Sequence, residues 1–145
     1  MSLVVDFSQV HREIANYLAR LADPVPYFDF VGEKIKHDVQ ERIRYTKEDP
    51  DGHEWEPWRP YTAERREFLG NYDQGIMWDT GVLLESVYFD VDGAFGLDIG
   101  TNVWYDANQQ EGKGRLPKRE IFGWEKDQLP MLAQAFATFV ETGLL

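Results

Sequence analysis

The chain has 145 residues, 43% of them hydrophobic, so it can bury one core and is expected to form a single domain over 1–145. Its formal net charge of −11 argues against a protein that binds nucleic acid through phosphate contacts or lies on an anionic membrane. With no cysteine, the sequence excludes disulfides, thiolate metal sites and cysteine nucleophiles.

Two amphipathic helices are predicted in the N-terminal third. The first covers 6–22, where Asp6 and Gln9 are placed for a capping box, and residues 23–26 end it because two of them are proline. Its apolar side chains recur at helical spacing: Phe7, Val10, Ile14, Leu18 and Leu21. The second helix covers 28–46, and the short link between the two predicts a helical hairpin. The chain start lacks the basic region of a signal peptide, and no stretch is long enough for a transmembrane helix.

Loops and one hairpin are predicted for the middle of the chain. Residues 49–52 are a turn signal, and 53–61 hold two prolines and three aromatic residues, so an ordered loop is expected. Thr62 is placed to cap a short helix that ends near Leu69. Residues 87–100 alternate apolar and polar side chains around an Asp-Gly pair, and this pattern predicts a β-hairpin.

The C-terminal part is predicted to hold one helical turn over 104–111, a flexible glycine segment and a last helix that begins near Asp127. The apolar face of this helix is formed by Leu129, Leu132, Phe136, Phe139 and Val140. The expected fold class is α+β: an N-terminal helical pair, a small antiparallel sheet with a central hairpin, and a C-terminal helix packed on it.

Asp79-Thr80-Gly81 matches the active-site triplet of aspartic proteases, in which two carboxylates share a proton. A homodimer would supply two copies of Asp79. However, the protease triplet follows a strand and leads into a loop, whereas residues 82–87 have the pattern of a helix that Asp79 or Thr80 would cap. We interpret the triplet as a helix cap and keep a homodimeric protease as the alternative from another functional class.

No cofactor or metal site is expected from the remaining motifs. His11, His37 and His53 form no zinc-binding pair, and the acidic turn at 49–52 lacks the other ligands of a calcium loop. The glycine segment 112–115 has neither the spacing nor the hydroxyl residue of a phosphate-binding P-loop.

Aromatic and basic residues in two loops, 52–61 and 101–122, are the candidates for a protein–protein interface. The predicted interface residues are Trp55, Trp58, Trp104, Tyr105, Lys113, Arg115, Lys118 and Arg119. For the basic residues a second interpretation stays open, in which nearby carboxylates of the same loop balance their charge.

Five short motifs follow one another in a fixed order. They are Gly52-x-x-Trp55-x-Pro57-Trp58 with Thr62, Asp79-Thr80-Gly81-x-Leu83-Leu84-x-Ser86, Ile99-Gly100-Thr101-Asn102-Val103-x-Tyr105, Gln110-x-Gly112 and Leu116-Pro117-x-Arg119. In this order they resemble the phage virion morphogenesis proteins, the tail completion family of contractile-tailed and Mu-like phages. The chain departs from that pattern at Trp58, where leucine is usual, at Glu111, where an aromatic residue is favoured, and at residues 120–122, in place of Pro-Phe-Leu.

The resemblance implies a structural protein without catalysis, which completes the tail and helps it to join the head through protein–protein contacts. The implied partners are further copies in a ring, with a hexamer expected, and the tail tube or head–tail connector proteins. The implied location is the host cytoplasm during assembly and then the virion. An acidic ring would let DNA slide past without sticking. A ring component of a tail-like secretion or injection machine is the alternative among structural proteins.

Overall fold

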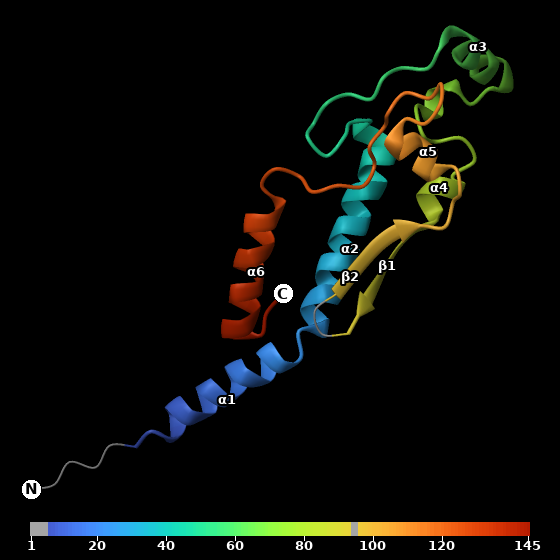
Figure 1. The fold of residues 1–145 in the computed structure, drawn as a ribbon. Helices are drawn as coiled ribbons and strands as arrows, with labels where there is room; N and C mark the ends of the chain where they lie inside the picture. Colours follow the sequence, from blue (N-terminus) through green and yellow to red (C-terminus); the bar gives the residue numbers. More distant parts are fainter. Residues whose placement is uncertain (1–5, 94–95) are drawn as a thin grey trace, which may run out of the picture.

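Helix α2 (Val25–Glu41) contacts both strands and the C-terminal helix in the computed structural model, which describes residues 6–93 and 96–145 (Figure 1). It continues directly into a π-helical turn, η1 (Arg42–Thr46), so the helix predicted over 28–46 is confirmed and begins three residues earlier. Its buried hydrophobic side chains recur at the spacing of one helical face: Tyr27, Val31, Ile35 and Val39. The fold is the expected mixture of helices and a small sheet.

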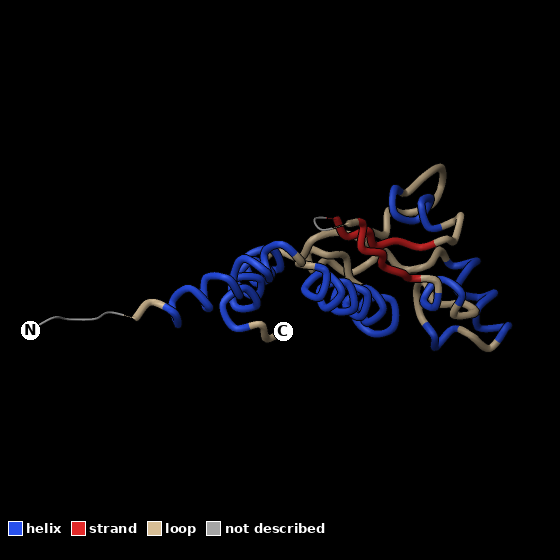
Figure 2. The backbone as a smooth tube through the Cα atoms, turned by 90° about the horizontal axis from the view of Figure 1, so that it is seen from below, coloured by secondary structure: helices blue, strands red, loops and turns tan. Residues whose placement is uncertain are grey.

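The sheet consists of β1 (Val87–Asp92) and β2 (Gly96–Thr101), which pair antiparallel as the hairpin pattern predicted (Figure 2). The sheet lies directly on α2 because Gly32 has no side chain: a β-carbon there would overlap the ring of Phe89. Phe95, which the sequence pattern places in the hairpin, lies outside the described residues.

Helix α6 (Gln128–Thr142) covers the N-terminal half of α2. The Tyr27 ring of α2 lies 4.9 Å from the Phe136 ring and 6.2 Å from the Phe139 ring, and its hydroxyl donates to the Leu132 carbonyl at 2.6 Å. The predicted C-terminal helix is therefore confirmed, but it packs on α2 and on the end of the first helix, α1 (Ser8–Ala22), whereas the sequence predicted that it packs on the sheet.

One residue of the predicted α6 face was placed wrongly. Leu129 is 53% exposed, whereas Gln128 is buried in the first turn of the helix. The side-chain oxygen of Gln128 accepts a hydrogen bond from the Glu125 backbone N–H at 3.2 Å. A polar side chain thus takes the buried position because it closes the turn before the helix.

Helix α1 (Ser8–Ala22) forms where the periodicity predicted it, but the predicted helical hairpin is wrong. The helix extends away from the body instead of lying along α2 (Figures 1 and 2). Its last turn packs against the end of α6, where Arg20 donates to the carbonyls of Val140 and Glu141 at 2.7 and 2.8 Å. These two hydrogen bonds fix the direction in which α1 leaves the body.

The start of α1 also differs from the prediction. Asp6 accepts a hydrogen bond from the Ser8 backbone N–H at 2.9 Å, but the Gln9 side chain interacts with Glu13 at 3.4 Å and not with the backbone of Asp6. The reciprocal capping box is therefore absent from this part of the chain.

The apolar face of α1 is exposed, and we call its five residues the α1 stripe: Phe7, Val10, Ile14, Leu18 and Leu21. Their exposed fractions run from 45% for Leu21 to 60% for Leu18, and the helix buries no residue. A contiguous apolar surface of this kind marks a contact site more often than a bare monomer surface.

Short helices complete the fold: α3 (Pro60–Leu69), η2 (Tyr72–Gln74), α4 (Val82–Glu85) and α5 (Asp106–Glu111). The predicted cap of α3 by Thr62 is wrong, because the helix begins at Pro60, which suits a first helical position that needs no N–H donor. Gly81, at φ 88°, precedes α4, and the Thr80 hydroxyl accepts from the Val82 N–H at 3.4 Å. Within the described ranges no helix is both long and apolar enough to span a membrane.

Candidate functional site

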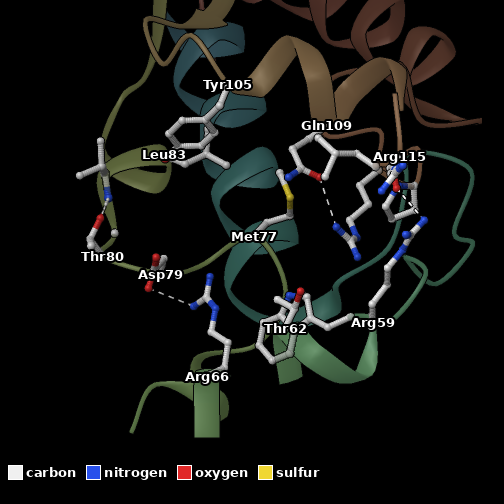
Figure 3. A pocket seen from close by; sticks show the side chains of 16 residues that line it. Arg59, Thr62, Arg66, Met77, Asp79, Thr80, Leu83, Tyr105, Gln109 and Arg115 are labelled. Atoms are coloured by element: carbon white, nitrogen blue, oxygen red, sulfur yellow. Dashed lines mark hydrogen bonds and ion pairs between the residues drawn. The ribbon is translucent and has the colours of Figure 1, made fainter. Parts of the chain in front are cut away.

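Four of the five sequence motifs meet at one pocket of about 560 Å³ (Figure 3). Its walls come from segments that are far apart in sequence, among them α3, the turn before α4, the start of α5 and the loop after it. The motif residues in the walls are Trp58, Thr62, Asp79, Thr80, Gly81, Leu83, Tyr105, Leu116, Pro117 and Arg119. Motifs that are separate in the sequence are therefore brought together around one pocket in the structure.

Asp79 serves as a hydrogen-bond acceptor at the edge of this pocket. Its carboxylate accepts from the Asn71 side chain at 2.6 Å and forms an ion pair with Arg66 at 3.1 Å. The triplet precedes the four-residue helix α4 and does not follow a strand, so its surroundings differ from those of an aspartic protease. The geometry favours a structural carboxylate that joins the turn before α4 to α3.

Four arginines line the pocket, and the sequence analysis identified two of them, Arg115 and Arg119. Arg66 donates to the Trp78 carbonyl at 3.0 Å and lies 5.0 Å from the centre of the Trp58 ring. Arg59 donates to the Arg115 carbonyl at 2.8 Å. Arg66 could have been found from its spacing, because it follows Thr62 by one helical turn and lies on the same face of α3.

Arg119 is buried and joins the two loops that were predicted to form an interface. Its guanidinium donates to the carbonyls of Glu56, at 2.8 and 3.0 Å, and Pro57, at 3.3 Å, and to the side-chain oxygen of Gln109 at 3.2 Å. Burial lowers the pKa of Arg119 from its ordinary value. All three acceptors are neutral, so this arginine stabilises the loop arrangement through geometry that a lysine could not reproduce.

The Gln110-x-Gly112 motif holds the same loops from the other side. The Gln110 side chain accepts from the backbone N–H groups of Ile121 and Phe122, at 2.6 and 3.1 Å, and donates to the Phe122 carbonyl at 2.7 Å. Gly112 has φ 68°, and a β-carbon there would lie 2.8 Å from the Lys118 nitrogen. Both motif positions are thus explained by the packing of residues 109–112 against 118–122.

The predicted basic cluster is divided by the structure. Lys113 pairs with Glu111 at 2.9 Å, and Lys118 pairs with Glu120 at 2.8 Å, so carboxylates of the same loop balance these two lysines. Arg115 is exposed and lines the pocket.

The aromatic candidates also separate into buried and exposed groups. Trp55 is 5% exposed and donates from its ring nitrogen to the Glu120 carbonyl at 3.1 Å. Trp58 packs edge-on against Tyr72 at 5.4 Å, and Trp104, 82% exposed, packs edge-on against Tyr105 at 5.8 Å. That any of the eight predicted residues meets a partner stays a prediction, and Trp104 offers the largest exposed surface among these aromatic residues.

Asp106, at the start of α5, is buried in an unfavourable environment. It is 7% exposed, and its Oδ1 atom has no hydrogen-bond partner among the described residues. Burial raises the pKa of this carboxyl above its ordinary value. No sequence pattern indicated this position.

The turn at 49–52 brings Asp49, Asp51 and His53 together, with one potential ligand atom from each within 4.8 Å of the others. The Asp49 carboxylate already accepts from the backbone N–H groups of Asp51 and His53, each at 2.9 Å. These hydrogen bonds close the turn, and they explain the cluster without a metal ion.

A comparison with known families agrees with the order of the motifs. A model of the phage virion morphogenesis family matches residues 5–140 of the chain. No curated protein and no solved structure was found to match it. The match includes both the pocket and helix α1, neither of which was defined by any single motif.

Proposed function

The chain belongs to the phage virion morphogenesis family, and we propose that within phage morphogenesis it completes the tail and joins it to the head. The observation that carries this proposal is the family match over residues 5–140. We place the protein in the host cytoplasm during assembly and afterwards in the virion.

The proposed mode of action is protein–protein contact, with further copies of the chain in a ring and with tail tube or head–tail connector proteins. The exposed α1 stripe and the exposed Trp104 support this mode, because aromatic and apolar side chains in such positions supply most of the energy of protein contacts. The negative charge supports a ring through which DNA passes without binding.

The pocket offers a second contact surface for a partner. Arg59 and Arg115 lie at its wall beside Arg66, and only Arg66 is paired with a carboxylate in the described residues. A guanidinium that faces a concave site binds a carboxylate through charge-assisted hydrogen bonds. We propose that an acidic side chain of a partner protein enters this pocket.

The proposal is tested in a host that carries the parent phage with this gene deleted. Electron microscopy of the lysate is expected to show heads and tails that remain separate, and the wild-type gene supplied in trans is expected to restore joined particles. Joined, infectious particles in the absence of the gene would rule the proposal out.

The pocket is tested in the same assay with Arg115→Glu, which reverses one exposed charge. We expect this variant to restore far fewer joined particles than wild type. Arg65→Glu is the matched control, since Arg65 is exposed on α3 and lies outside the pocket. Equal rescue by both variants would remove the pocket from the contact surface.

A further inference from the structure

A second apolar surface lies over α2, lined by residues other than those of the arginine-lined pocket. It is a groove of about 500 Å³ between β2, α6 and the segment 122–124. Its lining includes Phe28, Leu97, Ile99, Phe122, Trp124 and Leu132. Trp124 is 54% exposed at its rim, so the groove presents a large aromatic side chain to solvent.

Helix α1 has the shape and chemistry that such a groove accepts. Its 15 residues extend over about 22 Å at 1.5 Å per residue, and the α1 stripe forms one continuous apolar face. Amphipathic helices bind proteins in this way, with anchors one turn apart seated in an apolar groove. We propose that the α1 stripe of one copy of this chain docks in the groove of a second copy.

The helix cannot reach the groove of its own chain. Arg20 fixes the last turn of α1 to the C-terminal end of α6, and only Asp23 and Pro24 separate α1 from α2. Pro24 is fully buried, and α1 points away from the sheet and the body of α2 in both views (Figures 1 and 2). Contact between stripe and groove therefore has to be made between chains.

A second copy fits better than an unrelated partner because each chain carries both halves of the contact. One association event removes the stripe of one copy and the groove of the other from water. The charges agree: Arg12 and Arg20 outnumber Glu13 in α1, whereas the charged residue in the groove lining is Asp98. Since the chain as a whole carries −11, an apolar contact with locally opposite charge is the favourable way to bring copies together.

A stripe-to-groove contact is heterologous, because two different surfaces meet. Repeated from copy to copy, it leaves a free stripe at one end and a free groove at the other until the chain of copies closes into a ring. The proposed contact thus rests on the self-association that we propose for the function, and it names the surfaces that would carry it.

Cysteine cross-linking tests the contact directly, since the natural chain has no cysteine. Ile14→Cys places a thiol on the α1 stripe, and Trp124→Cys places one at the groove rim. Mixed and oxidised, the two variants are expected to form a disulfide-linked pair. Phe68→Cys is the control partner, because Phe68 is 89% exposed on α3, away from the groove.

Two results of this experiment would overturn the proposal. Dimerisation of Ile14→Cys alone, as efficient as that of the mixture, would show that the stripes pair with each other. Equal cross-linking of Ile14→Cys to Phe68→Cys and to Trp124→Cys would show random collision.

Sedimentation of complementary variants gives an independent measurement. Wild type is expected to form large assemblies at high concentration. The double variant Ile14→Asp with Leu18→Asp removes the apolar stripe. Trp124→Glu should lower the affinity of the groove for the stripe by at least about tenfold. Each variant alone is expected to stay monomeric. Their mixture is expected to form a 1:1 complex and nothing larger, because only one intact stripe and one intact groove remain.

A wild-type protein that stays monomeric at every concentration would overturn the proposed contact, and so would a mixture that stays monomeric. The deletion assay separates this failure from failure of the proposed function. If joined particles depend on the gene but the stripe-to-groove cross-link does not form, the proposed function holds and the proposed contact is wrong. If the cross-link forms but joined particles appear without the gene, the contact holds and the proposed function is wrong.

Discussion

Helices α1 and α6 are both 15 residues long and both carry an apolar face, yet only α6 uses that face within the chain. Phe136 and Phe139 of α6 pack against Tyr27, whereas Ile14 and Leu18 of α1 are exposed. The comparison shows that amphipathic periodicity specifies a helix and a face but does not specify which molecule covers that face. Helix α2 covers the apolar face of α6, and we propose that a second copy of the chain covers the apolar face of α1.

The largest expected effect is on the α6 side of the comparison. Phe139→Ala should lower the free energy of unfolding by about 3–5 kcal/mol, because it leaves a cavity beside Tyr27. Urea unfolding of dilute protein, followed by circular dichroism, measures the change. Leu18→Ala is the matched control on α1 and should stay within about 0.5 kcal/mol of wild type. A comparable loss from both would mean that α1 packs inside one chain.

The interloop contact at Arg119 should give the next largest effect. Arg119→Met keeps most of the side-chain volume but leaves the carbonyls of Glu56 and Pro57 without their donor, so we expect a loss of roughly 2–3 kcal/mol in unfolding free energy. The same urea titration measures it. Lys118→Met, at the neighbouring exposed position, should change little, and a similar loss there would argue against a special role for Arg119.

Asp106→Asn should raise the free energy of unfolding, whereas the two preceding substitutions lower it. The raised pKa means that the folded state disfavours the charged carboxylate, so the penalty is fully present above the raised folded pKa and is relieved as the pH falls through it. The amide should therefore stabilise the fold by about 1 kcal/mol at pH 7, and the gain should shrink at acid pH. Melting temperatures at several pH values test this, with the exposed Asp98→Asn as control. Destabilisation at pH 7 would show that the ionised carboxylate has a favourable role.

The smallest expected effect on stability belongs to the α1 stripe. Ile14→Gln with Leu18→Gln should leave the unfolding of dilute protein within about 0.5 kcal/mol per residue, since both side chains are already in water and glutamine suits a helix. The same variant should lose the large assemblies in sedimentation. A loss of stability without a loss of assembly would show that the apolar face of α1, like that of α6, packs within its own chain.

Much of the candidate site could be predicted because its chemistry lies in short motifs. Gln110 and Gly112 meet local needs: a side chain that bonds two nearby backbone groups, and a positive φ. Arg119 also lies in a motif, but its acceptors at Glu56 and Pro57 come from a distant segment. Arg59 and Arg66 were not predicted: the spacing of Arg66 from Thr62 indicated a shared helix face, but nothing in this segment shows that the face meets the loop 115–119.

The sequence by itself determined the helices, the hairpin and the family, because periodicity, turn residues and motif order are properties of neighbouring positions along the chain. It could not determine that α1 leaves the body, that Gln128 replaces Leu129 in the core, or that Trp55 and Arg119 are buried while Trp104 is exposed. These features depend on contacts such as Arg20 with Val140 and Trp55 with Glu120, which join residues far apart in the chain. Only the tertiary structure brings such groups within hydrogen-bonding distance, and it thereby decides which apolar faces are left for a partner.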